Sequence, residues 1–157
     1  MKRKIKDFFI KAAATGLGIG YIPLMPGTFG SILGVGICLL LNRGGVPVYI
    51  SGVVIIGIAA IKISGDANAL FGEHDSGKIV IDEIVGYLVA MLLIPAEVEY
   101  LVVGFVVFRL FDIFKPYPAG TVDKKVGGGL GVVLDDVIAG VYTNIVLWVI
   151  IVVRGAL

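Results

Sequence analysis

Five long apolar stretches constrain the fold of this chain more than any other feature of its sequence. They cover approximately residues 29–41, 46–61, 79–94, 98–111 and 130–153. Apolar runs of this length are typical of helices in lipid, where each backbone polar group must be hydrogen-bonded within its own segment. The mean hydropathy of +1.03 and the 58% hydrophobic content exceed those of water-soluble domains. The sequence therefore predicts an integral membrane protein.

The predicted fold is all-α: a membrane helical bundle of about four to five short transmembrane helices, in one domain over residues 1–157. A bilayer requires about 20 apolar residues per helix, and several of the stretches are shorter. A compact apolar bundle attached to a membrane or a partner is therefore the alternative. The N-terminal sequence MKRKIKDFFIK is basic and lacks a cleavable signal pattern. We expect it to form a permanent basic helix at the membrane interface.

The distribution of charge predicts an orientation. Five spans starting from a cytoplasmic N-terminus place ten of the thirteen basic residues on the cytoplasmic side, as membrane proteins prefer. The same arrangement brings nine of the twelve acidic residues to or near that face. The net charge of only +1, without a basic patch interleaved with aromatic residues, argues against a nucleic-acid partner. The single cysteine, Cys38, excludes an internal disulfide.

A first acidic pair, Asp82 and Glu83, interrupts the apolar sequence IVIDEIVGYLVAMLL. A carboxylate at membrane depth costs roughly 2.5 kcal/mol or more unless it is paired, hydrated or bound to a cation. Two adjacent carboxylates therefore indicate a cation site. The simpler interpretation is that both lie in the headgroup region at a helix N-terminus, where acidic residues are favoured.

The segment FRLFDIFKPYP combines two basic residues with an acid. Arg109 and Asp112 are three positions apart and share a helix face, and Lys115 precedes the proline that ends the helix. A structural ion pair is one interpretation. The guanidinium and the ammonium would also stand together at the inner face, where they suit contacts to phosphate.

A second acidic pair, Asp135 and Asp136, follows the glycine-rich entry of GGGLGVVLDDVIAG. Adjacent carboxylates repel unless a cation lies between them, and oxygen-rich carboxylate sites favour Mg²⁺. The run Gly127–Gly129 either lets an anion come close to backbone amides at the helix start or forms a flexible linker.

Two loops supply further candidates. In PLMPGTFGS, Thr28 and Ser31 are candidates for helix capping, the more common role, or for donation to a phosphate. In GEHDSGK, His74 lies beside Asp75 and near Lys78, which suits an orienting or proton-transfer role. A lone histidine in a loop is more often simply solvated.

Carboxylates and cations gathered at one membrane face suit metal-assisted attack on a phosphate ester. Mg²⁺ would polarise the phosphoryl oxygens and activate water, while Arg109 and Lys115 would stabilise the developing charge. The location at the membrane predicts a lipid substrate with its phosphate at headgroup depth.

At these residues the sequence resembles the phosphatidylglycerophosphatase A family, through PLMPGTFGS, GEHDSGKIVIDEIVG, FRLFDIFKPYP and GGGLGVVLDDVIAG in that order. The resemblance implies an Mg²⁺-dependent phosphatase of the bacterial inner membrane, and the charge distribution predicts that its active site lies on the cytoplasmic side. Its reaction would convert phosphatidylglycerophosphate to phosphatidylglycerol. By matching motifs, the metal and catalytic candidates are Asp82, Glu83, Asp112, Asp135 and Asp136, with His74 and Asp75 as further catalytic candidates. The phosphate-binding candidates are Arg109, Lys115, Lys78 and Thr28.

Two other functions are compatible with membrane carboxylates. A CDP-alcohol phosphotransferase also uses Mg²⁺, but its family resembles D-G-x₂-A-R with spaced aspartates, whereas the acids here are neighbours. A transporter or a non-enzymatic cation-binding membrane protein is the other alternative. Acids clustered at one face, without a polar path across the helices, argue against transport.

Overall fold

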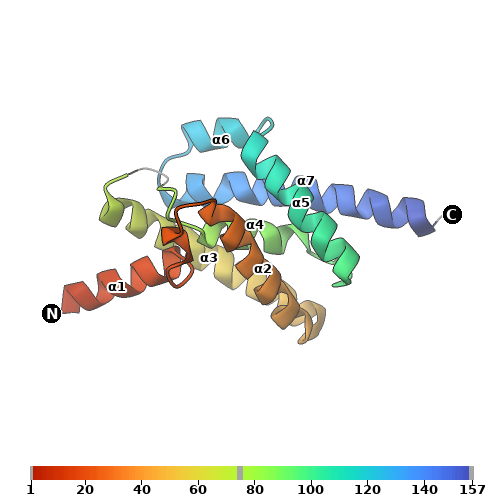
Figure 1. Ribbon diagram of the computed structural model, residues 1–157, viewed down its shortest axis with the longest axis horizontal. Coiled ribbons are helices and arrows are strands. Elements are labelled where there is room, and N and C mark those ends of the chain that lie inside the picture. Colours follow the sequence, from red (N-terminus) through yellow and green to blue (C-terminus); the bar gives the residue numbers. More distant parts are fainter. Residues whose placement is uncertain (1, 74–75, 156–157) are drawn as a thin grey trace.

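The computed structural model describes residues 2–73 and 76–155, which form helices and turns without a β-strand. Figure 1 shows the arrangement, with α1 projecting at one end and the C-terminal end of α7 at the other. The all-α prediction is confirmed for the described residues. The elements are α1 (Lys2–Ala14), the 3₁₀ turn η1 (Ile19–Tyr21), α2 (Pro26–Asn42), α3 (Gly45–Phe71), α4 (Ile81–Ala90), α5 (Val98–Phe114), α6 (Ala119–Lys125) and α7 (Gly128–Gly155).

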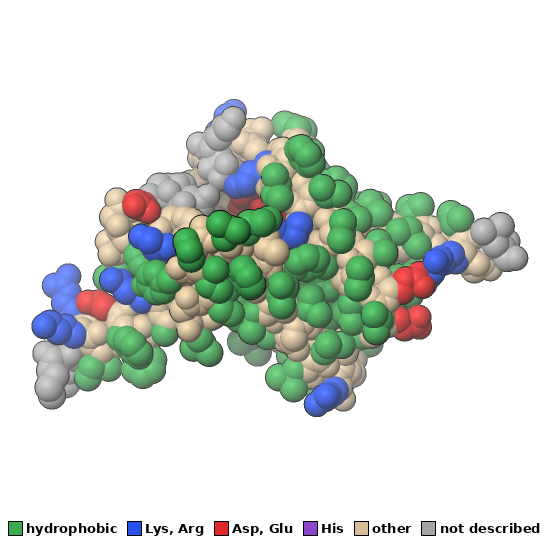
Figure 2. Space-filling model, viewed as in Figure 1, with side chains coloured by type: hydrophobic (Ala, Val, Ile, Leu, Met, Phe, Trp, Pro, Cys, Tyr) green, Lys and Arg blue, Asp and Glu red, His purple; other side chains and the backbone are tan. Residues whose placement is uncertain are grey.

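Each of the five apolar stretches lies mainly in one helix, α2, α3, α4, α5 or α7 in turn. Two helices, α3 and α7, are long and apolar enough to cross a membrane. The expected count of four to five such helices is therefore matched only in part by helix length and composition. Many large apolar side chains on α2, α3, α5 and α7 are exposed. Figure 2 shows apolar side chains spread over the visible face, with charged side chains at both ends and others between them.

Helix α4 lies inside the bundle and packs against α2, α3, α5 and α7. Nearly all of its residues are buried, and it has only 10 residues, or about 15 Å. Helices α4 and α7 approach closely because both carry glycine: a Cβ at Gly140 would lie 2.3 Å from the carbonyl oxygen of Gly86. Small residues at such crossings are typical of helices packed in membranes.

Polar side chains from other helices satisfy the carbonyl groups where α4 ends. The Tyr49 hydroxyl donates to the Leu88 carbonyl at 2.8 Å. The Asn144 amide donates to the carbonyls of Ala90 at 2.9 Å and Leu92 at 2.8 Å. Unpaired carbonyls inside an apolar bundle would cost several kcal/mol each. These contacts explain how a short helix ends within the bundle.

Parts of two segments between the apolar stretches are helical. Helix α3 continues beyond residue 61 to Phe71, with Ser64 and Ala67 buried. The segment between α5 and α7 contains the short helix α6. Both segments carry charge, which a helix tolerates when it leaves the apolar layer and keeps one face packed.

Candidate active site

The acids of the first pair lie in the first turn of α4. Asp82 is buried and the Glu83 side chain is 15% exposed. The helix start is held against the end of α1, since the Val80 amide donates to the Ala14 carbonyl at 2.9 Å. Negative charge is stabilised near a helix N-terminus, which contributes to placing both acids there.

The second acidic pair lies near the start of α7, where both Asp135 and Asp136 are buried. Close packing of α7 fixes their position. A Cβ at Gly129 would lie 1.9 Å from the carbonyl oxygen of Ile61 in α3. Gly129 therefore permits helix contact, a role that neither prediction for the glycine run anticipated.

The end of α5 brings basic groups to the acids. Arg109 pairs with Asp112, as predicted from their spacing, and its Nη1 atom is also 4.0 Å from Oε1 of Glu83. The Lys115 Nζ atom donates to Oδ2 of Asp135 at 2.6 Å. Each basic residue thus connects α5 to a different acidic pair.

These side chains surround a pocket of about 130 Å³. Five carboxylates and the Lys115 ammonium line it, and Arg109 lies next to two of these carboxylates, those of Asp112 and Glu83. Ligand oxygens of Asp82, Glu83 and Asp136 lie within 4.8 Å of one another, which is close enough to share one metal ion. The pocket is lined by Ser76, Gly77, Ile79, Asp82, Glu83, Asp112, Lys115, Asp135 and Asp136.

The donor set fits a hard divalent cation. All the acidic ligands are oxygens, which suit Mg²⁺ better than softer metals. Oε2 of Glu83 is buried and has no hydrogen-bond partner among the described residues. A buried carboxylate oxygen without a hydrogen bond is stabilised by a nearby cation. Asp82, Glu83 and Asp136 are the side chains best placed to hold one.

Gly27 lies directly against two side chains of the site. A Cβ at this position would lie 2.1 Å from Oε1 of Glu83 and 3.0 Å from Nη1 of Arg109. Sequence reasoning did not select Gly27, although PLMPGTFGS contains it. The need for a residue without a side chain at position 27 is visible only in the folded structure, where α2, α4 and α5 pack together.

The expected capping role of Thr28 and Ser31 is wrong. Helix α2 starts at Pro26 after Met25, without a side-chain cap. The Ser31 hydroxyl donates to the Gly27 carbonyl within the helix. The Thr28 hydroxyl is buried without a hydrogen-bond partner in the described structure. Thr28 thus remains available to contact a ligand.

The remaining predicted residues lie beside the pocket or outside the described structure. Lys78 lines an adjacent hollow together with Ser76 and Gly77. His74 and Asp75 lie outside the described residues. Sequence reasoning missed Ser76, whose hydroxyl donates to Glu73 at 2.9 Å. Its position in GEHDSGK, between a candidate acid and a candidate lysine, was the available signal.

Comparison with known proteins shows the family of this chain. The family model described as phosphatidylglycerophosphatase A matches residues 12–151, which include every residue that lines the pocket. The chain belongs to the phosphatidylglycerophosphatase A family. The resemblance carried by the four motifs is therefore confirmed.

Members of the phosphatidylglycerophosphatase A family from two bacteria are similar over most of their length. The Haemophilus influenzae protein is 35% identical over 90% of this chain and 88% of its own. The Escherichia coli protein is 34% identical over 87% of this chain and 80% of its own. A Bacteroides thetaiotaomicron protein, named provisionally as a phosphatidylinositol-3-phosphatase, is 34% identical over 96% of this chain and 99% of its own. No solved structure matches the chain.

Proposed function

We propose that this protein hydrolyses the terminal phosphate of phosphatidylglycerophosphate to give phosphatidylglycerol and inorganic phosphate. The observation that carries the proposal is the acidic pocket, in which Asp82, Glu83 and Asp136 converge beside Arg109 and Lys115. Two relatives are named for this activity. The third relative's name also describes a phosphatase that acts on a phospholipid.

The proposed cofactor is Mg²⁺, held by Asp82, Glu83 and Asp136, with Asp112 and Asp135 as further candidate ligands. When bound, the ion would supply Lewis-acid stabilisation of the phosphoryl oxygens and a more acidic water. In the overall reaction, water oxygen forms a bond to phosphorus, the bond from phosphorus to the glycerol oxygen breaks, and that oxygen gains a proton.

The basic residues would bind the phosphate and its developing charge. Arg109 has a buried Nε–H that has no partner among the described residues, and its guanidinium suits a phosphate oxygen. Lys115 lines the pocket and donates a hydrogen bond to Asp135. The buried Thr28 hydroxyl would add a neutral donor. His74 and Asp75 stay predictions for proton transfer.

The proposed topology has five crossings, with the N-terminus and the acidic pocket on the cytoplasmic side of the bacterial inner membrane. Helices α2, α3, α5 and α7 would face lipid with their exposed apolar side chains. The segment containing α4 would cross inside them, where its irregular end is hydrogen-bonded by Tyr49 and Asn144 rather than exposed to lipid.

The direct test is phosphate release by the purified protein in mixed micelles. We expect release from phosphatidylglycerophosphate with Mg²⁺, and loss of at least nine tenths of the rate in EDTA that is restored by added Mg²⁺. Phosphatidylinositol 3-phosphate and the water-soluble glycerol 3-phosphate are the comparison substrates. Full activity in EDTA would contradict the metal mechanism, and a preference for either comparison substrate would contradict the proposed substrate.

The Gly27→Ala variant should lower kcat by roughly 10–100-fold, because its methyl group must displace Glu83 or Arg109 and a misplacement of about 1 Å is enough for such a loss. Gly36→Ala is the matched control in the same helix, since no atom lies within 4 Å of its Cβ position. The rate of phosphate release per amount of folded protein measures the effect of both substitutions. Equal activity of the two variants would show that Gly27 does not shape the site.

A further inference from the structure

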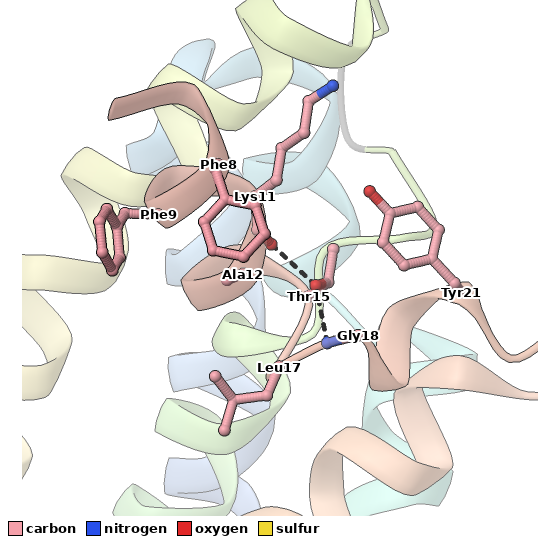
Figure 3. Close-up of a pocket in the computed structure, with 8 residues that line it drawn as sticks. All are labelled: Phe8, Phe9, Lys11, Ala12, Thr15, Leu17, Gly18 and Tyr21. Carbon is pink, nitrogen blue, oxygen red and sulfur yellow. Dashed lines mark hydrogen bonds between the residues drawn. The ribbon is translucent and has the colours of Figure 1, made fainter. Parts of the chain in front are cut away.

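An apolar groove of about 400 Å³ lies between α1 and η1, outside the acidic pocket. Figure 3 shows Phe8, Leu17 and Tyr21 around Thr15 and Gly18, with Lys11 extending from the end opposite Leu17. Phe8 is 67% exposed and Leu17 is 88% exposed. The groove therefore presents large apolar side chains that no described residue covers.

The helix that forms one side of the groove is basic. Helix α1 carries Arg3, Lys4, Lys6 and Lys11, against one acid, Asp7. An occupant that is apolar at one end and anionic at the other complements this combination. A phospholipid has that chemistry.

A second hollow lies next to both the groove and the acidic pocket. It shares Tyr21 with the groove, and shares Ser76 and Gly77 with the acidic pocket. Two segments that line this second hollow, η1 and the residues before α4, pack closely. A Cβ at Gly20 would lie 1.9 Å from the Lys78 carbonyl oxygen. The three hollows therefore follow one another along the protein surface.

Two lysines from this path, Lys11 of the groove and Lys78 of the second hollow, lie close to one aromatic ring. The Nζ atom of Lys11 is 5.5 Å from the centre of the Phe71 ring, and that of Lys78 is 5.3 Å from it. Neither lysine forms an ion pair within the described ranges 2–73 and 76–155. Two ammonium groups close to one ring repel each other, and a bound anion near both would reduce that repulsion.

We propose that the groove binds an acyl chain of the same lipid molecule whose terminal phosphate enters the acidic pocket. The phosphodiester of that lipid lies at Lys11 and Lys78, and the glycerol between its two phosphates passes Ser76 and Gly77. The path thus places an apolar, a cationic and an acidic region in the order in which phosphatidylglycerophosphate carries its chain and two phosphates. This assignment rests on the proposed function and adds residues that select the substrate.

The kinetic test compares phosphatidylglycerophosphate carrying oleoyl chains with the same lipid carrying butanoyl chains, in identical detergent micelles. Leu17→Asn should raise KM for the long-chain lipid roughly tenfold, leaving kcat and the short-chain KM unchanged. Leu93→Asn is the matched control. Both leucines have φ near +60°, at 59° and 60°, and both are exposed. Asparagine tolerates this conformation, so neither change strains the backbone.

A charge variant tests the middle of the path. Lys11→Gln should raise KM for both chain lengths roughly fivefold, because both lipids carry the phosphodiester. Lys62→Gln removes an exposed lysine of α3 that lies outside the three hollows and should leave KM unchanged. Equal KM values for Lys11→Gln and wild type would overturn the cationic part of the proposal.

Direct labelling separates this inference from the proposed activity. Phosphatidylglycerol with a photoactivatable diazirine in one acyl chain should label residues 8–21 in wild type, and at least fivefold less in Leu17→Asn. Labelling confined to the lipid-facing helices would indicate contact with bulk lipid and contradict acyl-chain binding in the groove. Equal kinetic effects of Leu17→Asn on both chain lengths would contradict it as well. Absence of phosphate release by wild type would contradict the proposed function, while the labelling pattern would still test the groove.

Discussion

Asp136→Asn should lower kcat for phosphatidylglycerophosphate by about 10³-fold while the protein stays folded in the membrane. Asp136 is buried, and its ligand oxygen lies within 4.8 Å of those of Asp82 and Glu83. Asparagine keeps the shape of the side chain but removes its charge, so the three-carboxylate set loses one anionic ligand. We expect Asp82→Asn to behave in the same way.

We expect Asp136→Asn not to reduce the stability of the folded protein. Several carboxylates face a pocket of about 130 Å³, and their mutual repulsion disfavours the folded protein without a cation. We therefore expect the melting temperature of Asp136→Asn in EDTA to equal or exceed that of wild type. Added Mg²⁺ should raise the melting temperature of wild type and raise that of the variant less.

Glu97→Gln is the control for Asp136→Asn, since it removes an exposed acid before α5 that lies outside the pocket. Its kcat should match that of wild type. Phosphate release, together with melting temperature with and without Mg²⁺, measures both effects. If Asp136→Asn kept more than about a tenth of the wild-type kcat, Asp136 would not be an essential ligand.

The convergence of the acids could be predicted because each pair interrupts an apolar stretch. A charge in such a stretch is costly, so Asp82 and Asp136 were conspicuous in the sequence. The structure brings them to one pocket with Asp112 and Asp135. Their catalytic and metal-binding roles stay predictions, since proximity alone does not distinguish a ligand from a base.

The contribution of glycine could not be predicted in the same way. Gly27 matters because Glu83 and Arg109, far away in the sequence, occupy the space that its side chain would fill. Gly36, in the same helix, has no such neighbour. Nothing local in the sequence distinguishes the two positions.

The length of α4 was likewise beyond sequence reasoning. The apolar pattern continues to residue 94, but the helix ends at Ala90. It can end there because Tyr49 and Asn144, on α3 and α7, bond its last carbonyls. Long-range hydrogen bonds of this kind leave no periodic signal. The expected orientation in the membrane and the five crossings stay predictions.

Gly129→Ala should lower the free energy of unfolding by about 3 kcal/mol, the largest stability effect that we expect from adding one methyl group near the site. The added Cβ would lie 1.9 Å from the Ile61 carbonyl oxygen and 2.4 Å from the Gly65 nitrogen. Both are backbone atoms of α3, so no side-chain rotation removes the overlap. The start of α7 must move away from α3.

That movement should also reduce activity, because Asp135 and Asp136 lie less than two turns further along α7. Gly127→Ala is the matched control two residues earlier, where no atom lies within 4 Å of the Cβ position. Thermal unfolding in detergent, followed by circular dichroism, should show a lower melting temperature for Gly129→Ala alone. Equal melting temperatures would mean that α7 adapts without cost, and that the contact between α3 and α7 does not fix the position of the acids.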